Sequence, residues 1–540
     1  MNNFKHILFA SLLMASLSAT AQETYQDSKL AENQLTGTAR YIGMGGAMEA
    51  LGADISTIST NPAGIGLFRK SQVSVSAGVI AQGGAENYTS LSGNRIDFNG
   101  KKSHPTFDQI GIVWSPKLKG NSFINLAFNY HKSADFGQIL NAANSLKTYD
   151  ENGKERFASQ NKLAAAKYAW IKGNNFSQDE ANVLWSSVDD GYLTAFGANE
   201  DASQMNYLNS DLFLYGQYQH GYIGEYDFNV SGSLNNRVWL GLTIGLHDVH
   251  YNSTSFYSEN LENGAIADSK EQVKIDGTGF DVKAGVIFRP VEDSPFRIGA
   301  YFNTPVFYDL TTHNDNDMKL YYAQANAQET YPDIKPAASD YDFRLNTAWK
   351  AGFSLGHTIG NNFALGATYE YAWYDHMDNR IKDSGYYDVY YDSYYESSSS
   401  DEEMNANTRR TLKGVSTLKV GLEYKPISML SLRLGYNYAS AMFDENGYRD
   451  MTIYSPGVAY ATSTDYTNWK STNRFTCGIG FNYQKLSIDV AYQYSSQNGD
   501  FYPYMSYYPE DNSKFGANIA PVTEVNNKRH QLLMTVGYRF

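Results

Sequence analysis

The chain repeats a single hydrophobic pattern, in which every second residue is apolar over segments of about ten to fourteen residues. In LLMTVGYRF at 532–540, the alternating apolar positions run from Leu532 to Phe540. Segment 486–494, LSIDVAYQY, alternates in the same way. Because successive side chains of a strand point to opposite faces, this period of two predicts strands with one apolar and one polar face.

Segment length separates a membrane barrel from a soluble sandwich. About eleven residues at ~3.3 Å each, tilted near 45°, rise ~25 Å, which is the apolar height of an outer-membrane barrel. Strands of soluble proteins usually have only about five or six residues. The sequence therefore predicts an all-β fold, a fourteen-stranded antiparallel transmembrane barrel. The expected strands lie near 71–81, 106–116, 122–132, 225–234, 238–250, 277–289, 296–308, 344–357, 362–375, 414–425, 429–439, 473–483, 486–496 and 529–540.

The connections between these segments alternate strictly between short and long. Short periplasmic turns and long extracellular loops are typical of outer-membrane barrels, and an even strand number places both termini in the periplasm. In a soluble β-sandwich, a strict alternation of short and long connections is not expected. The expected long loops are 82–105, 133–224, 251–276, 309–343, 376–413, 440–472 and 497–528.

The N-terminus indicates export. Lys5 precedes an apolar stretch at 7–19, and Ala19-Thr20-Ala21 offers a cleavage site, so residues 1–21 are interpreted as a signal peptide cleaved near Ala21. The expected location is the outer membrane of a Gram-negative bacterium. No Cys directly follows the cleavage site, which excludes a lipoprotein. Cys477 is the single cysteine, so no intramolecular disulfide can form.

Composition excludes several other classes. Aromatic residues make up 15% of the chain and charged residues only 19%, which is the opposite of a disordered protein. After the first twenty positions, no apolar run of about twenty residues remains, so a helical transporter is excluded. A net charge of −14 gives no electrostatic reason to bind nucleic acid.

Fourteen strands enclose more space than wall side chains can fill, because about eight strands give a packed interior. The candidate plug is 22–70, which is rich in Gly, Ala and Thr and precedes the barrel at 71–540. Its GMGG at 43–46 suggests a dinucleotide loop, but Met48 occupies the third glycine position and no strand precedes it. We therefore expect a hatch inside the lumen and no cofactor.

Three motifs carry a family resemblance. The hatch with its run Asn61-Pro62-Ala63-Gly64, the segment FRIGAYFNTPVFYDL at 296–310, and the terminal aromatic Phe540 are similar to the FadL/TodX-like outer-membrane transporters of long-chain fatty acids and aromatic hydrocarbons. The resemblance implies a fourteen-stranded barrel plugged by the hatch, uptake of hydrophobic ligands, and release sideways into the membrane. It also implies hatch gating at 61–64 and barrel-insertion signalling at Phe540.

Each candidate site has a plainer alternative. Asn61-Pro62 predicts a rigid turn, which alone explains the motif as well as gating does. Lumen-facing charges are interpreted either as contacts for a ligand carboxylate or, preferably, as a network tying hatch to wall, since buried charges need partners. Lumen-facing apolar residues either line a ligand path or pack on the hatch. The path candidates are Trp239, Ile287, Tyr301, Arg297 and Arg433.

The long insertion at about 133–224 is expected to hold two helices. One covers about 155–172, and the other follows Ser177, whose spacing to Glu180 forms a capping box. They form either an outer docking groove or a simple cover for the barrel mouth. Tyrosine-dense segments at 386–395 and 501–509 are interpreted as loop tips. The outer docking candidates are Phe157, Trp170, Val183, Leu184 and Trp185.

No catalytic or metal-ligand spacing is evident. His247 and His250 lie three apart on a strand and point to opposite faces, so the sequence predicts neither a metal site nor an enzyme. The favoured function is passive uptake of hydrophobic small molecules. The alternatives are a surface-binding or adhesion protein acting through its long loops, and a general porin. Expected partners are outer-membrane lipid and lipopolysaccharide, the barrel assembly machinery and the ligand, with the barrel as a monomer.

Overall fold

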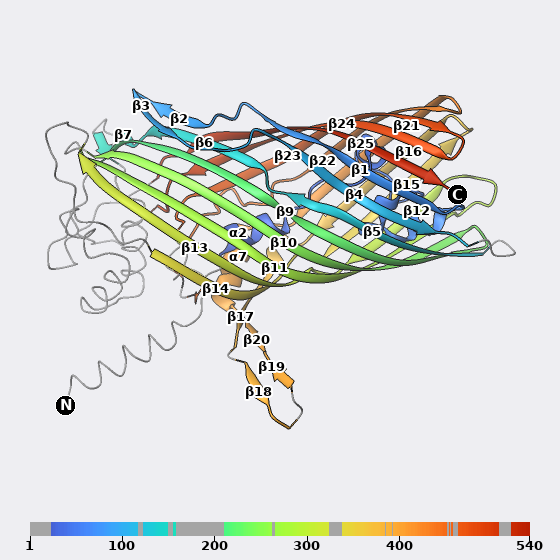
Figure 1. Ribbon diagram of the computed structural model, residues 1–540, viewed down its shortest axis with the longest axis horizontal. Helices are drawn as coiled ribbons and strands as arrows, with labels where there is room; N and C mark the ends of the chain where they lie inside the picture. The colour runs from blue at the N-terminus through green and yellow to red at the C-terminus, as the bar shows by residue number, and fades with distance from the viewer. Residues whose placement is uncertain are drawn as a thin grey trace.

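The computed structural model shows a closed antiparallel β-barrel with a plug inside it (Figure 1). In the described part of the chain, no helix is both long and apolar enough to cross a bilayer. The structure describes residues 23–116, 122–149, 155–157, 210–261, 265–322, 337–383, 385–390, 393–450, 453, 455–456, 463–506 and 520–540.

The wall consists of fourteen staves. A stave is one strand, or two successive strands, that runs along the barrel between a short turn and a long loop. The last stave pairs with the first, from Gln72 opposite Arg539 to Gly83 opposite Lys528, which closes the barrel and confirms the predicted fold class. The staves are β1 (Gln72–Gly83), β4 (Ser103–Trp114), β5 (Phe123–Asp135) with β6 (Gln138–Ser145), β9 (Ser210–Leu234), β10 (Val238–Leu261), β11 (Ala265–Phe288), β12 (Arg297–Asn303) with β13 (Phe307–Tyr322), β14 (Ala337–Asn346) with β15 (Lys350–Ile359), β16 (Phe363–Ala372) with β17 (Asp378–Lys382), β21 (Val415–Ile427), β22 (Leu430–Ala439), β23 (Tyr466–Tyr483), β24 (Leu486–Tyr502) and β25 (Thr523–Arg539).

The period of two sorts side chains between the outside and the lumen as predicted. On β25, Leu532 is 55% exposed on the outer surface, whereas its neighbour Leu533 is fully buried inside. Large apolar side chains cover the outside of every stave near the short turns. An outward apolar band on a closed barrel is what contact with lipid requires, because closure leaves no unpaired strand edge.

Several staves extend well beyond this band, which corrects the expected loops. Within 251–276, predicted as a loop, residues 251–261 and 265–276 form the upper parts of β10 and β11. Residues 133–145 and 210–224 of the predicted insertion are also largely strand. The expected helix at 155–172 is wrong at its start, because Glu155–Phe157 forms β8 and pairs with β7 (Lys147–Tyr149). Outside the lipid band, neither face of a stave must be apolar, so the alternation that marks a strand disappears.

Three adjacent staves are interrupted at one level, where the sequence predicted continuous strands at 296–308, 344–357 and 362–375. The ladder between the first two breaks from Asn303 opposite Lys350 to Phe307 opposite Asn346. The third breaks over 373–377, at the short helix η4 (Tyr374–His376). Pro305 cannot donate a ladder hydrogen bond, which accounts for one side of the break.

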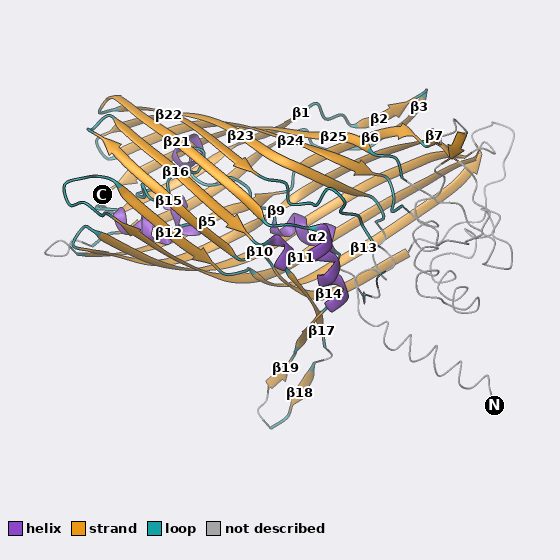
Figure 2. Cartoon of the chain, turned by 180° about the vertical axis from the view of Figure 1, so that it is seen from behind, coloured by secondary structure: helices purple, strands orange, loops and turns teal. Residues whose placement is uncertain are grey.

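The hatch, residues 23–71, lies inside the barrel and directly precedes β1. It contains α2 (Thr24–Ala31), α3 (Ala39–Gly43), η1 (Ile55–Ser59) and η2 (Pro62–Leu67). Figure 2 shows α2 partway along the barrel, while other helical pieces of the hatch lie toward the end that carries the C-terminus. Beside α2 lies α7 (Glu402–Thr411), whose Thr408 hydroxyl is 2.9 Å from that of Thr24.

Short strands outside the staves complete the described strands. The hairpin of β18 (Tyr386–Asp388) and β19 (Ser393–Tyr395) projects sideways from the wall below β17 and β20 (Ser398–Ser400) (Figure 1). This hairpin contains the tyrosine-dense segment expected as a loop tip. β2 (Tyr88–Leu91) and β3 (Asn94–Asp97) form a second hairpin within the predicted loop 82–105.

Candidate functional site

The Asn61-Pro62-Ala63-Gly64 run forms a capped turn at the start of η2. The Asn61 Oδ1 accepts a hydrogen bond from the backbone N of Ala63 at 3.2 Å, and Pro62 occupies the first helical position. The Asn61 Nδ2 donates to the carbonyl oxygen of Glu49 in the hatch at 3.2 Å and to that of Val286 in β11 at 3.4 Å. Asn61 therefore both caps the turn and ties it to the wall.

Glycines in the wall make room for this turn. A Cβ atom added at Gly241 would lie 2.3 Å from the carbonyl carbon of Pro62, and one at Gly285 would lie 2.0 Å from Asn61 Oδ1. Ser231 of β9 donates to the Pro62 carbonyl at 2.8 Å. The turn is thus seated against three neighbouring staves, β9, β10 and β11.

Gly64 is packed just as closely within the hatch. Its added Cβ would lie 2.4 Å from the Thr57 hydroxyl, and its carbonyl oxygen accepts from the backbone N of Ala53 at 3.0 Å. A larger residue would therefore push η1 and η2 apart. These contacts give all four residues of the motif a structural role in holding the hatch together.

Two apolar path candidates pack on this turn. Trp239 and Ile287 form one buried cluster with Ala63 and Leu67. Arg297 lies over the Trp239 ring, with its guanidinium carbon 5.6 Å from the ring centroid, and donates to the carbonyl oxygen of Leu51 at 2.9 Å. Trp239, Ile287 and Arg297 therefore all contact the hatch. Of the two alternatives for such residues, a ligand path or packing on the hatch, these contacts favour packing.

The polar path candidates join a network. Tyr301 donates to Glu370 at 2.5 Å, and Arg433 bonds Glu423 and Asp489 at 2.7 Å each. The hatch enters the network through Arg40, which is 3.3 Å from Glu423. Buried charges with such partners favour the interpretation of a network tying hatch to wall.

The hatch carboxylate of Glu49 makes further ties to the wall. Glu49 is fully buried and accepts from Tyr41 at 2.9 Å, Thr368 at 2.7 Å and Lys419 at 2.9 Å. Two of these partners lie on the wall strands β16 and β21. The half of the lumen nearest the short turns is consequently filled by the hatch, which is hydrogen-bonded to the wall.

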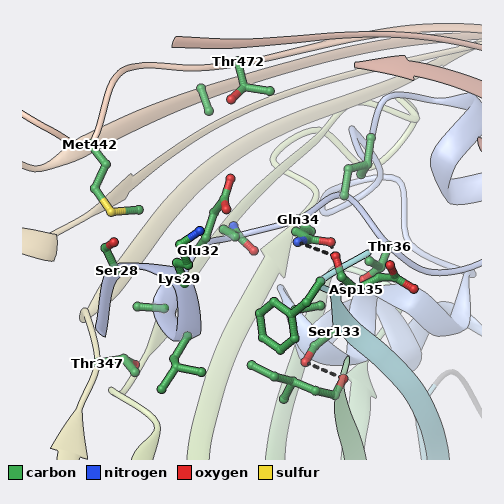
Figure 3. A pocket seen from close by; sticks show the side chains of 18 of the residues that line it. Ser28, Lys29, Glu32, Gln34, Thr36, Ser133, Asp135, Thr347, Met442 and Thr472 are labelled. Atoms are coloured by element: carbon green, nitrogen blue, oxygen red, sulfur yellow. Dashed lines mark hydrogen bonds between the residues drawn. The ribbon is translucent and has the colours of Figure 1, made fainter. Parts of the chain in front are cut away.

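Above this plug lies a cavity of about 310 Å³ between α2, the hatch segment 32–36 and the wall. Two buried apolar clusters meet here, and α2 contributes Leu30 to one and Tyr25 and Ala31 to the other. In Figure 3, Ser28, Lys29, Glu32 and Gln34 of the hatch lie across the middle of the view, with Thr472 above them and Ser133 and Thr347 below. Apolar and polar groups together make the lining amphipathic, as ligand sites usually are.

Lys29 and Arg474 line this cavity, and no carboxylate among the described residues is hydrogen-bonded to either of them. Arg474 donates to Asn437 Oδ1 at 2.9 Å and to the carbonyl oxygen of Asn33 at 3.3 Å, both of them neutral groups. Burial lowers the pKa of the Lys29 amine to about 8, and longer-range attraction by Glu32 and Asp465 opposes this shift. At neutral pH the Lys29 amine still carries its proton, so Lys29 and Arg474 both present a positive charge to the cavity.

The cavity also adjoins the break in the wall. Thr304 and Val306 line it from the first interrupted stave, Thr347 from the second, and Ala372 and Tyr374 from the third. On the outside of the break, Trp349 is 39% exposed and stacks on Phe302, with ring centroids 5.2 Å apart. An amphipathic cavity therefore lies directly behind the one described stretch where three consecutive staves lose their ladder.

The sequence did not identify Lys29, Arg474, Val306 or Thr347 as site residues. The one local signal in the sequence is Thr304-Pro305, because Pro305 has no backbone N–H for a ladder bond. The five path candidates do not line the described cavity. Their positions near the plug follow from their strands, but the cavity depends on where α2 lies, which alternation does not predict.

The outer docking candidates cannot be placed. Trp170, Val183, Leu184 and Trp185 lie outside the described residues, and only the backbone of Phe157 is placed, in β8. Phe540 lies at the turn end of the seam, where its backbone N donates to the carbonyl of Ser71 at 3.1 Å. Its side chain is exposed beside Tyr538 on the outer surface.

No family model matches the sequence, and no curated protein matches it. Among solved structures, the chain is similar to a FadL homologue of Pseudomonas aeruginosa, with 15% identity and a TM-score of 0.48 over 94% of this chain and 99% of that one. It is also similar to the toluene transporter TbuX of Ralstonia pickettii, with 10% identity and a TM-score of 0.47 over 94% and 99%. The toluene transporter TodX of Pseudomonas putida follows, with 10% identity and a TM-score of 0.46 over 94% and 100%.

Proposed function

We propose that this chain is an outer-membrane channel of a Gram-negative bacterium that takes up small amphiphilic or hydrophobic molecules passively, with the hatch as gate. The observation that carries the proposal is the amphipathic cavity behind the interrupted staves. A ligand that reaches this cavity finds the axial path filled by the hatch. The nearest alternative route leads sideways, through the wall.

The lining favours a ligand with an anionic head and an apolar body. Lys29 and Arg474 supply positive charge, and Arg474 has only neutral hydrogen-bond acceptors at present. The apolar clusters around Leu30 and Tyr25 supply apolar surface for the body of the ligand. A carboxylate bonded to either cation gains a charge-assisted hydrogen bond, so a fatty-acid-like molecule fits better than an uncharged aromatic one.

Sideways release at the break is the second part of the proposal. Between Val306 and Thr347, a threonine hydroxyl takes the place of a backbone acceptor, so fewer ladder bonds resist local opening. Trp349 and Phe302 cover the outside of this stretch with apolar rings, which suit contact with lipid tails. The released ligand would pass directly from the cavity into the bilayer.

The environment of the channel belongs to the same proposal. The apolar band is expected to contact outer-membrane lipid, and the staves above it lipopolysaccharide. Phe540 is exposed at the end of the closing stave, where the barrel assembly machinery can bind it. We further propose that residues 1–21 are removed near Ala21 and that the barrel acts as a monomer.

Uptake and ion conductance, measured together on the barrel in lipid bilayers, test the proposal. The intact protein should deliver a radiolabelled long-chain fatty acid while conducting few ions. Deleting residues 23–70 should raise conductance strongly, because fourteen staves around an empty lumen leave a wide channel. If the deletion changes neither uptake nor conductance, the plugged-channel proposal is wrong.

The same assays separate the two alternatives. A general porin would conduct ions steadily with its hatch intact. A surface-binding protein would lose binding when residues 158–209 are removed and would never have delivered the fatty acid. Native mass spectrometry of the purified barrel identifies any molecule that stays bound in the cavity.

A further inference from the structure

The lumen wall beside the cavity holds a buried cluster of two histidines, three carboxylates and one lysine. The carboxylates are Glu225, Asp227 and Asp281, and the lysine is Lys283. All are nine-tenths buried or more. The histidines, His131 and His247, lie on β5 and β10, whereas the other four come from β9 and β11.

Lys283 uses only one oxygen of each carboxylate. Its Nζ lies 2.7 Å from Glu225 Oε1, 2.6 Å from Asp281 Oδ1 and 3.4 Å from Asp227 Oδ1. The second oxygen of each carboxylate points instead toward a histidine ring. The lysine side of the cluster is thus a satisfied ion-pair group. The histidine side is a set of carboxylate oxygens and ring nitrogens, which are the atom types that bind metals.

Several of these oxygen and nitrogen atoms lack hydrogen-bond partners within the described part of the chain. Among the described residues, neither ring nitrogen of His247 has a hydrogen-bond partner, although the side chain is only 4% exposed. The closest approaches are 3.5 Å from Nε2 to Asp281 Oδ2 and 3.9 Å from Nδ1 to Glu225 Oε2. Asp227 Oδ2 is likewise buried without a hydrogen bond. Buried polar atoms of this kind call for a missing partner.

The charge of the cluster calls for a cation. Three carboxylates against one lysine leave a formal charge of −2 when both imidazoles are neutral. An uncompensated buried charge is strongly unfavourable, and a divalent cation would cancel this one.

From these contacts we infer that Glu225, His247 and Asp281 bind a divalent transition-metal ion of the zinc type. One ligand atom from each residue lies within 4.8 Å of the other two. Two atoms bound to one tetrahedral zinc ion lie about 3.4 Å apart, close to the 3.5 Å between His247 and Asp281. Imidazole with carboxylate is a ligand set that suits zinc.

An ion can reach this group from the cavity. Glu225, His247 and Asp281 all line it, so a water molecule from the cavity can complete the coordination. His131 and Asp227 flank the shared Glu225 on its far side. The ion would join β9, β10 and β11 at the level of the cavity floor. Spacing along the chain does not indicate this site, because Glu225, His247 and Asp281 lie on three different strands.

Metal titration of the full-length barrel in detergent, after removal of bound metal with a chelator, tests the inference. We expect saturable binding of one zinc ion and, with cobalt instead, visible absorption bands of a low-coordinate site. His247→Gln keeps the residue polar and of similar size, and should weaken zinc binding by about 100-fold or more. His530→Ala is the matched control, because His530 lies on the outer surface and contacts Tyr492.

Each outcome decides the question. Loss of binding in His247→Gln with retention in His530→Ala supports the site, provided that both variants keep the electrophoretic shift of a folded barrel. Equal zinc binding by wild type and His247→Gln would overturn it. So would a wild-type barrel that binds no zinc. If His247→Gln does not fold, Asp281→Asn replaces it under the same criteria.

Discussion

Val306 and Thr347 face each other across the interrupted wall through two hydrogen bonds. The backbone N of Val306 donates to the Thr347 hydroxyl at 2.9 Å, and the backbone N of Thr347 donates to the Val306 carbonyl at 3.1 Å. Both residues also line the cavity. This pair is therefore the place where a covalent link would block sideways passage without filling the binding site.

A disulfide between Val306→Cys and Thr347→Cys, with Cys477 replaced by serine, should reduce fatty-acid uptake at least tenfold while leaving binding intact. Because the link fixes the break, a reducing agent should restore uptake. The control pair is Gln497→Cys with Asn527→Cys, which also lines the cavity but lies on continuous staves. Full uptake through the oxidised first pair would exclude this exit.

Fatty-acid binding should depend on pH through Lys29. Its pKa of about 8 is lowered by burial, so the amine is charged below this value and neutral above it. A bound carboxylate favours the charged form; affinity is therefore full at lower pH and falls as the pH rises through 8. The loss should be about ten- to a hundredfold, the contribution of one charged hydrogen bond.

Isothermal titration at pH 6.5 and pH 9.5 checks this dependence. Lys29→Met should bind weakly at both values, and an uncharged aromatic ligand should show no pH step with either protein. A step of equal size in Lys29→Met would assign the titration to another group.

Gly241→Ala should displace the hatch. The new Cβ would lie 2.3 Å from a Pro62 backbone atom, which cannot rotate away as a side chain can. Overpacking of this kind costs ~1–3 kcal/mol, and the hatch should loosen enough to raise ion conductance. Gly232→Ala is the control, since its Cβ would meet only the Phe123 carbonyl oxygen at 3.4 Å. Equal conductance of both variants would contradict the seating of η2 described above.

Removing the lysine that pairs with Glu49 should destabilise the hatch more than removing both charges. Lys419→Met leaves a buried carboxylate without its cation, which costs ~3–5 kcal/mol. The double variant Glu49→Gln with Lys419→Met should recover most of this. Hydrogen exchange of the hatch amides measures the difference, and additive effects would show that the two side chains do not act as a pair.

The sequence predicts the lipid-facing barrel well, because lipid on one side and a crowded lumen on the other impose the alternation. Leu532 and Leu533, adjacent and equally apolar, still fall on opposite faces as the period requires. The upper parts of β10 and β11 were instead expected to be a loop. They lie outside the lipid-facing band, and strand pairing by itself does not require apolar residues at every second position.

The site was harder to predict because it joins residues from distant segments. His131 and His247 approach the same Glu225 from two strands that lie 116 positions apart in sequence. Thr347 belongs to an alternating segment, and nothing local shows that its hydroxyl replaces a ladder bond. Alternation along the strands predicts that Trp239 and Ile287 face the lumen, but only the position of Ala63 shows that they pack on the hatch.

The seam between β1 and β25 sets an order of events during biogenesis. Gln72–Gly83 can pair with Lys528–Arg539 only after the last residues of the chain have been delivered, so the wall stays open until then. Residues 23–71 are joined directly to β1 and bond outward to several staves, among them β5, β9 and β25. Until the last stave pairs, no closed lumen surrounds these residues. Encapsulation of the hatch is therefore completed no earlier than the sealing of the barrel by the final stave of the chain.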